Sequence, residues 1–306
     1  MGSDTPPNIL LEAIISVAPE LKKRADLVIL AHVSYFPKEA ISGITFLPIT
    51  EVISMQEAPL AAVRLKKNAS ICVGMQLLGE KTFDAFITGG NTGAFIACAK
   101  LFLSMLKGID RPALLTLLPT QKNPLAVLDV GANITCKAKH LVQFASMGIA
   151  YQKSRGILNP RFSLLNNGIE ENKGTSEIKE AYQSLKTMKN FAGNIEGREV
   201  FLGDIDLLVT DGFTGNIFLK TVEGISSYIL HLLNQMPTPV VRDLQQHLNY
   251  AEYPGAFLAG IDGIALKYHG NSSPLSLTQS IKAALQLVEH QFLDQIKSEL
   301  QNSLSS

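Results

Sequence analysis

The sequence has few cysteines and no excess of charge of either sign. Its three cysteines, Cys72, Cys98 and Cys136, lie far apart and form no CxxC pair, which argues against a disulfide framework or a zinc site. Lys plus Arg and Asp plus Glu number 27 each, so nothing global favours an acidic partner such as nucleic acid. We therefore expect a protein of the reducing cytoplasm with no nucleic-acid partner.

Long apolar runs and a targeting segment are also missing. No run reaches the ~18 residues that a membrane-spanning helix needs. The first residues, MGSDTPPNILLEAI, lack the basic flank and long apolar stretch of a signal peptide. The 306 residues are 46% hydrophobic and 18% charged, which is enough to bury a large core. We expect a single α/β domain over residues 1–306.

The well-known motifs of nucleotide and hydrolase sites are absent. The chain has no GxxxxGK[ST], GxGxxG, GxSxG or HExxH run. Asp206 and Asp211 flank one predicted strand and would lie about 16 Å apart, too far to share a metal ion. Cys136 beside Lys137 is a candidate low-pKa thiol, with a buried structural thiol as the alternative. These absences favour a site that positions and neutralises its reactants, with no metal.

What the sequence does contain is a repeated strand-turn-helix pattern. Short apolar strands run into turns rich in Gly, Asn and Thr, and an amphipathic helix follows each turn. The five turns are 89–93 (GGNTG), 129–133 (DVGAN), 166–175 (NNGIEENKGT), 211–216 (DGFTGN) and 269–272 (HGNS). Strands that are apolar on both faces and separated by helices predict a mostly parallel sheet covered on both sides. The fold class is therefore α/β.

The polar turns predict a binding cleft for an anion. In such sheets the turns collect at the carboxyl edge of the strands, where helix N-termini present free N–H groups and a partial positive charge. Lys173 lies directly before Gly174 and Thr175, and Thr175 or Ser176 is the predicted N-cap of the next helix. His269 is a candidate general acid or base, or a structural histidine. The alternative for the whole set is ordinary turn formation.

The same blocks resemble a known family. GGNTGAF, DVGANITCKAKHLVQFA, NNGIEENKGTSEIKEAY, TDGFTGNIFLKTVEG and KYHGNSS resemble, in order, the blocks of the bacterial phosphate acyltransferase family (acyl-acyl carrier protein:phosphate acyltransferase). The resemblance covers nearly the whole chain. It implies a three-layer sandwich with a mostly parallel sheet, like that of isocitrate and isopropylmalate dehydrogenases and phosphotransacetylases, assembled as a homodimer.

The resemblance also implies the reaction. Inorganic phosphate attacks the thioester of acylated acyl carrier protein, and the resulting acyl phosphate feeds phospholipid synthesis without a cofactor. By motif, Lys173 and Asn216 match the two leading catalytic residues. The residues that match the substrate-binding positions are Asn91, Thr92, Gly93, Asn133, Gly174, Thr175, Asp211 and His269. For all of these except the lysine, turn formation is the alternative.

The sequence departs from the family pattern at two places. The family begins with a short apolar strand ahead of an MGxD motif, whereas this sequence begins at Met1-Gly2-Ser3-Asp4. The first strand is therefore expected to be missing, and a start codon that was assigned late is the alternative. Pro254 and Tyr268 stand at atypical places, which weakens any specific role for His269.

Two regions are candidate contact surfaces. A basic set that includes Arg64 and Lys67 is expected to meet acidic carrier protein, with a solvated helix face as the alternative; its other members are Lys22, Lys23, Arg24 and Lys66. Residues 221–250 are expected to form a protruding helical pair. Its apolar tip, Leu232, Leu233, Met236, Val240 and Val241, would contact a dimer partner or the inner face of the membrane.

Three other functions stay open. The chain could be a phosphotransacetylase acting on short acyl-coenzyme A, or a dehydrogenase of related fold. It could also be a non-catalytic scaffold that binds carrier protein at the membrane.

Overall fold

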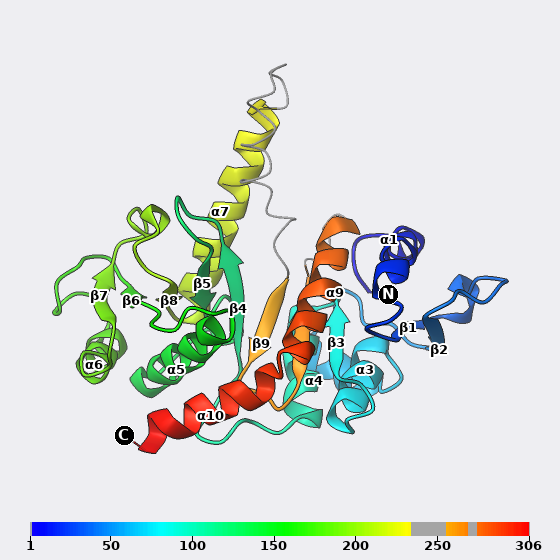
Figure 1. The fold of residues 1–306 in the computed structure, drawn as a ribbon, viewed down its shortest axis with the longest axis horizontal. Coiled ribbons are helices and arrows are strands. Elements are labelled where there is room, and N and C mark those ends of the chain that lie inside the picture. Colours follow the sequence, from blue (N-terminus) through cyan, green and yellow to red (C-terminus); the bar gives the residue numbers. More distant parts are fainter. Residues whose placement is uncertain (1, 234–254, 269–273, 306) are drawn as a thin grey trace. The chain divides into compact units, whose positions relative to one another are not determined.

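The computed structural model describes residues 2–233, 255–268 and 274–305 (Figure 1). The chain forms two compact units, which are described one at a time. Unit 1 contains residues 1–105 and 254–293, and unit 2 contains residues 106–253 and 294–306.

Unit 1 contains two small groups of strands. β1 pairs in parallel with β2, and β10 pairs in parallel with β3 and antiparallel with β9. Its described elements are α1 (Pro7–Leu21), β1 (Leu27–Ala31), η1 (Val33–Tyr35), β2 (Ile44–Pro48), α2 (Pro59–Leu65), α3 (Ser70–Gly79), β3 (Ala85–Thr88), α4 (Thr92–Phe102), β9 (Ala256–Ala259), β10 (Ile264–Lys267) and α9 (Pro274–Glu289).

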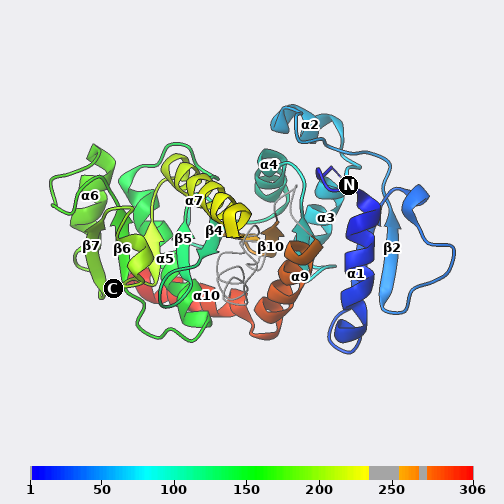
Figure 2. The ribbon, with the colours of Figure 1, turned by 90° about the horizontal axis from the view of Figure 1, so that it is seen from above.

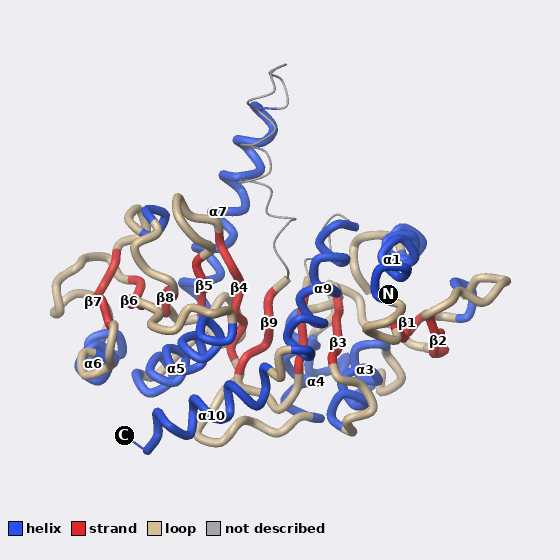
Figure 3. The backbone as a smooth tube through the Cα atoms, in the orientation of Figure 1, coloured by secondary structure: helices blue, strands red, loops and turns tan. Residues whose placement is uncertain are grey.

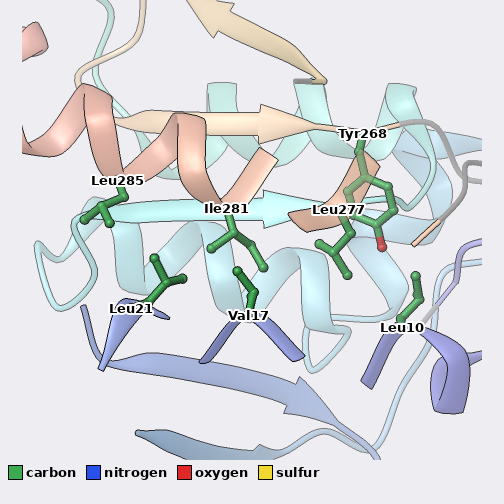
Figure 4. Close-up of a cluster of buried hydrophobic side chains, with 7 residues drawn as sticks. All are labelled: Leu10, Val17, Leu21, Tyr268, Leu277, Ile281 and Leu285. Carbon is green, nitrogen blue, oxygen red and sulfur yellow. The ribbon is translucent and has the colours of Figure 1, made fainter. Parts of the chain in front are cut away.

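A buried cluster joins the first and last parts of unit 1, where α1 lies beside α9 (Figures 2 and 4). The side chains come from one stripe of each helix, at helical spacing, and from the residue after β10. The cluster consists of Leu10, Val17, Leu21, Tyr268, Leu277, Ile281 and Leu285. Burying each aliphatic side chain contributes about 1.5–3 kcal/mol. The same burial raises the pKa of Tyr268 to about 12.

The strands of unit 2 lie in the order β4-β5-β8-β6-β7. β5, β8, β6 and β7 run parallel to one another, whereas β4 is antiparallel to β5. Every residue of β5, β6 and β8 is buried. Its described elements are β4 (Ala113–Leu118), β5 (Leu125–Leu128), α5 (Ala138–Ser154), β6 (Phe162–Leu165), α6 (Ser176–Leu185), β7 (Phe191–Ile195), η2 (Val200–Leu202), β8 (Leu207–Val209), α7 (Gly212–Leu233) and most of α10 (Phe292–Ser305).

The predicted strand-turn-helix pattern is confirmed (Figure 3). The five junctions are β3 to α4, β5 to α5, β6 to α6, β8 to α7 and β10 to α9. The α/β class with a mostly parallel sheet is likewise confirmed. Two antiparallel pairs, β4 with β5 and β9 with β10, were not predicted. In each pair a short loop joins the two strands. Such a loop suits antiparallel strands, because a parallel pair needs a crossover connection of a dozen or more residues.

The predicted helical pair falls partly outside the described residues. Its first helix is α7, but Met236, Val240 and Val241 lie outside the described residues. Among the described helices, each falls short of the length and apolarity needed to cross a bilayer.

Candidate active site

The candidate site of unit 2 lies at the carboxyl edge of three neighbouring strands. β8 lies between β5 and β6 and is parallel to both, so the turns that follow these strands start at one edge. Asn133 follows β5, Lys173 follows β6, and Asp211 and Asn216 follow β8. Residues from three stretches of sequence are thus brought to the same edge, as the sequence predicts.

Asp129 organises the turn after β5. Its carboxylate is fully buried and accepts five hydrogen bonds. Oδ1 accepts from the backbone N–H groups of Leu114 (3.0 Å), Gly131 (3.0 Å) and Ala132 (2.9 Å). Oδ2 accepts from the backbone N–H (2.8 Å) and side-chain amide (2.9 Å) of Asn133. Burial raises the pKa of the Asp129 carboxyl above its usual value, although these donors oppose the shift.

Asn133 joins this turn to the start of α7. Its side-chain amide also donates to the Pro112 carbonyl oxygen at 2.8 Å, and its own carbonyl oxygen accepts from the Gly212 N–H at 2.8 Å. A Cβ atom at Gly212 would collide with the Asn133 carbonyl oxygen, and one at Gly215 would overlap the carbonyl oxygen of Asp129. The glycines of the TDGFTGN segment therefore let α7 begin directly against the turn after β5.

Asp211 and Asn216 differ in the hydrogen bonds that their side chains form. Asp211 caps the first turn of α7, because its two oxygens accept from the N–H and hydroxyl of Thr214, each at 2.8 Å. Asn216 is exposed beside Gly131, and its amide forms no hydrogen bond with the residues that the structure describes. It lines an open hollow of about 310 Å³ with Ile217, Lys220 and Thr221.

In the loop after β6, hydrogen bonds hold the backbone in place, whereas the side chain of Lys173 is exposed. Asn166 donates to the Lys173 carbonyl oxygen at 3.2 Å, and Asn194 donates to the Glu170 carbonyl oxygen at 2.9 Å. The Lys173 ammonium group makes no ion pair or hydrogen bond with any described residue. The sequence did not single out the two asparagines as supports, because their partners are set by the packing of β6 against β7.

The end of this loop has the geometry of a helix start. Gly174 has φ +86°, a left-handed conformation that suits glycine, and a Cβ there would lie 2.6 Å from Asn166 Oδ1. Thr175 is the N-cap of α6, because its hydroxyl accepts from the Ile178 N–H at 3.4 Å. The predicted N-cap is confirmed.

The remaining predicted residues belong to unit 1. Asn91 is buried at the start of α4, where its side-chain oxygen accepts from the Ala94 N–H at 3.0 Å. Its side-chain nitrogen donates to three carbonyl oxygens of residues 54–57. Thr92 opens α4, and Gly93 packs against Pro59. Substrate contact by these residues stays a prediction, and His269 lies outside the described residues.

Cys136 does not have the environment of an activated thiol. Burial and the nearby Asp129 carboxylate raise its pKa to about 11, so little thiolate forms at neutral pH. The low-pKa hypothesis is wrong. Nowhere in the described part of the chain do three potential metal ligands gather.

The fold is that of an α/β protein whose polar turns and helix starts gather at the carboxyl edge of a mostly parallel sheet. A family model described as "Fatty acid synthesis protein" matches residues 1–295. The phosphate acyltransferase of Clostridium tetani is 37% identical over 325 aligned positions, covering 99% of this chain and 96% of that protein. The chain belongs to this phosphate acyltransferase family.

Solved structures share the fold at low identity. A branched-chain phosphotransacylase from Enterococcus faecalis is 13% identical, with a TM-score of 0.63, covering 94% of this chain and 98% of that one. A structure described as a 4-hydroxythreonine-4-phosphate dehydrogenase from Salmonella typhimurium is 15% identical, with a TM-score of 0.51 and coverage of 92% and 95%. The predicted relation to phosphotransacylase and dehydrogenase folds is therefore confirmed at the level of the fold.

Proposed function

We propose that this enzyme transfers a fatty acyl group from the thioester of acyl carrier protein to inorganic phosphate, with Lys173 and Asn216 as its catalytic residues. One observation carries the proposal. The exposed Lys173 ammonium and Asn216 amide follow neighbouring parallel strands, and neither has a polar partner among the described residues. A cation and a neutral donor at one sheet edge suit an oxyanion in a displacement at a carbonyl carbon.

The proposed reaction forms one C–O bond and breaks one C–S bond. A phosphate oxygen attacks the thioester carbonyl carbon, a tetrahedral oxyanion forms, and the carrier thiolate leaves to be protonated by solvent. Lys173 would neutralise the phosphate as it loses water, and Asn216 would donate to phosphate or to the developing oxyanion. A model thiol has a pKa of about 8.5, so the leaving group needs little acid assistance.

The deciding experiment follows both products. Purified protein is incubated with acylated carrier protein and phosphate, and free thiol and hydroxylamine-trapped acyl phosphate are measured together. We expect equal amounts of each and none without phosphate. Turnover of short acyl-coenzyme A in place of acylated carrier would identify a phosphotransacetylase. Carrier binding without turnover would identify a scaffold, and a nicotinamide-dependent absorbance change would identify a dehydrogenase.

The carrier-docking surface that we propose is the end of α2. Arg64 and Lys67 are exposed there, next to Leu65, whose exposed fraction is 79%. Lys66 instead pairs with Glu57 at 2.6 Å, and Arg24 pairs with Glu289 at 2.6 Å. Arg64 and Lys67 are thus the better candidates for contact with an acidic partner.

Reversing both charges, Arg64→Glu with Lys67→Glu, should raise the KM for acylated carrier about 3- to 10-fold at low salt and leave kcat unchanged. The reason is that rim charges chiefly speed association, so the difference should shrink as salt is added. Initial rates against carrier concentration provide the measurement. The matched control is Lys186→Glu with Lys189→Glu on exposed positions of unit 2. An unchanged KM at low salt would remove α2 from the docking surface.

The homodimer contact that we propose is an apolar stripe along α7. It lies on the side opposite the buried face of that helix, and exposed apolar stripes mark contact surfaces. The stripe consists of Phe213, Ile217, Ile225, Tyr228 and Leu232, and the buried face of Gly212, Gly215, Leu219, Val222 and Ser226.

Ile225→Asp should shift the protein from dimer to monomer, because it places a charge in the middle of the stripe. Light scattering after gel filtration measures the mass, and Ser227→Asp, beside the stripe on the same helix, is the control. If Ile225→Asp stays dimeric and instead fails to float with anionic liposomes, the stripe serves membrane contact. We propose that the protein is cytoplasmic and makes peripheral contact with the inner face of the membrane.

A further inference from the structure

Arg111 lies at the same edge of the unit 2 strands as Lys173 and Asn216, although it precedes a strand instead of following one. β4 is antiparallel to β5, so the amino end of β4 lies beside the carboxyl end of β5. Arg111 stands directly before Pro112, and β4 begins at the next residue, Ala113. Arg111 is therefore placed beside the turn that follows β5.

Hydrogen bonds hold Arg111 against this turn. Its Nη1 donates to the Thr135 carbonyl oxygen at 3.0 Å. The carbonyl oxygen of Pro112 accepts from the Asn133 side-chain amide at 2.8 Å. Thr135 and Asn133 both belong to the turn after β5, so the guanidinium extends from β4 toward the strands that precede Asn216 and Lys173.

Most N–H donors of this guanidinium stay available. The side chain is half-buried, and it makes no ion pair with any residue that the structure describes. The neighbouring Asp110 carboxylate pairs instead with Lys139 at 2.6 Å. Burial raises the pKa of the Cys136 thiol in the turn after β5, and the charge of Arg111 opposes that shift. A guanidinium that is anchored on one side and free on the other suits the oxygens of a phosphate ion.

The other charges at this edge leave the site short of positive charge. Asp129 accepts all five of its hydrogen bonds, as a carboxylate does, and Asp211 adds a second carboxylate. Glu170 lies on the same loop as Lys173. Phosphate carries more than one negative charge at neutral pH. Lys173 alone does not offset these charges, so a second cation would favour phosphate binding.

The strand spacing allows both cations to contact one ion. β4 and β6 are separated by β5 and β8, which places them about 14 Å apart if neighbouring strands lie about 4.8 Å apart. Extended arginine and lysine side chains each reach roughly 6 Å from the backbone, at about 1.5 Å per bond. The ammonium and guanidinium groups can therefore approach an ion between them from opposite sides.

We propose that Arg111 is a second cationic ligand of inorganic phosphate, on the side of the site opposite Lys173. This inference rests on the proposed function and adds a phosphate-binding residue to it. The planar guanidinium can donate two parallel hydrogen bonds to two phosphate oxygens, which fixes the orientation of the ion. Such a contact is present before and during the reaction, so it acts on KM more than on kcat.

Arg111→Gln should raise the KM for phosphate about 10- to 100-fold and leave kcat within about threefold, because charge-assisted hydrogen bonds are lost. Arg111→Lys keeps the charge without the planar fork and should raise this KM about 3- to 10-fold. Initial rates of thiol release at varied phosphate concentration provide the measurement. The matched control is Lys107→Gln, which removes an exposed cation from the same stretch before β4 and should leave both constants unchanged.

Two further readouts need no turnover, so they separate this inference from the proposed function. Phosphate at about 50 mM should raise the thermal midpoint of the unaltered protein above its value in sodium chloride of equal ionic strength, and the rise should be at least halved in Arg111→Gln. Phosphate should also slow the modification of Arg111 by phenylglyoxal, located by peptide mass. The control within the same protein is Arg161, which is exposed at the opposite edge, directly before β6.

An unchanged KM for phosphate in Arg111→Gln, whatever its stability, would overturn the inference and make Arg111 a structural residue of the turn. A rise confined to the KM for acylated carrier would also overturn it, because the residue would then contact the carrier. If the variant does not fold, equal modification of Arg111 with and without phosphate would overturn it. If the unaltered protein forms no acyl phosphate, the proposed function fails, and phenylglyoxal protection still decides whether Arg111 binds phosphate.

Discussion

Lys173→Ala is expected to lower kcat/KM for acyl phosphate formation about 100- to 1,000-fold, because it removes the catalytic cation that we assign to the reacting anion. The side chain is exposed and makes no ion pair with a described residue, so its loss should leave the free energy of unfolding within about 0.5 kcal/mol of the original. Initial rates of thiol release at varied phosphate concentration, with a denaturation curve, measure both quantities. The KM for phosphate should rise along with the fall in kcat.

The control for this variant is Lys179→Ala, which removes an exposed lysine from the adjacent helix α6. It should keep activity within about twofold, since it alters net charge alone. A Lys173→Ala protein that is folded and fully active would show that our assignment of this residue is wrong. Lys173→Arg separates charge from shape, because a guanidinium keeps the charge but differs in size and hydrogen-bond geometry.

Asp129→Asn is expected to destabilise the fold by about 2–4 kcal/mol, although the two side chains have the same shape. Each carboxylate oxygen accepts at least two hydrogen bonds, three at Oδ1 and two at Oδ2. Whichever way the amide turns, its NH₂ group faces N–H donors that then lack an acceptor. Urea unfolding followed by circular dichroism measures the change.

Asp211→Asn is the matched control for Asp129→Asn. Its carboxylate is half-buried and, among the described residues, is hydrogen-bonded to Thr214 alone, whose hydroxyl can rotate to accept from the new amide. A loss of about 1 kcal/mol or less is therefore expected there. Equal losses at the two positions would contradict the view that Asp129 is the main anchor of the turn.

Local features of the fold followed from the sequence. The short apolar strands ahead of the polar turns, the helix cap at Thr175 and all five strand-to-helix turns were predicted from apolar runs and turn residues. These depend on neighbours along the chain, so they can be inferred before any packing is known. The phosphate acyltransferase family was predicted from the order of the same blocks.

The support of the site could not be predicted in the same way. The donors to Asp129 include Leu114, on a strand fifteen positions earlier, and the loop of Lys173 depends on Asn194 from the next strand. No local pattern marks such partners, since they are chosen by strand pairing. Asp129 itself was visible as a strand-terminal aspartate before a Gly-Ala-Asn turn, a pattern that most often marks turn formation.

The sequence by itself determined the class of fold, the turns that carry the site and the family to which the chain belongs, because periodicity and turn chemistry are local. Only the tertiary structure decided which polar side chains form hydrogen bonds within the fold and which stay exposed. Asp211 caps a helix, whereas the side chain of Asn216, five residues later, forms no hydrogen bond with the described residues. Hydrogen-bond partners and strand neighbours are set by long-range packing, which cannot be inferred from local sequence patterns.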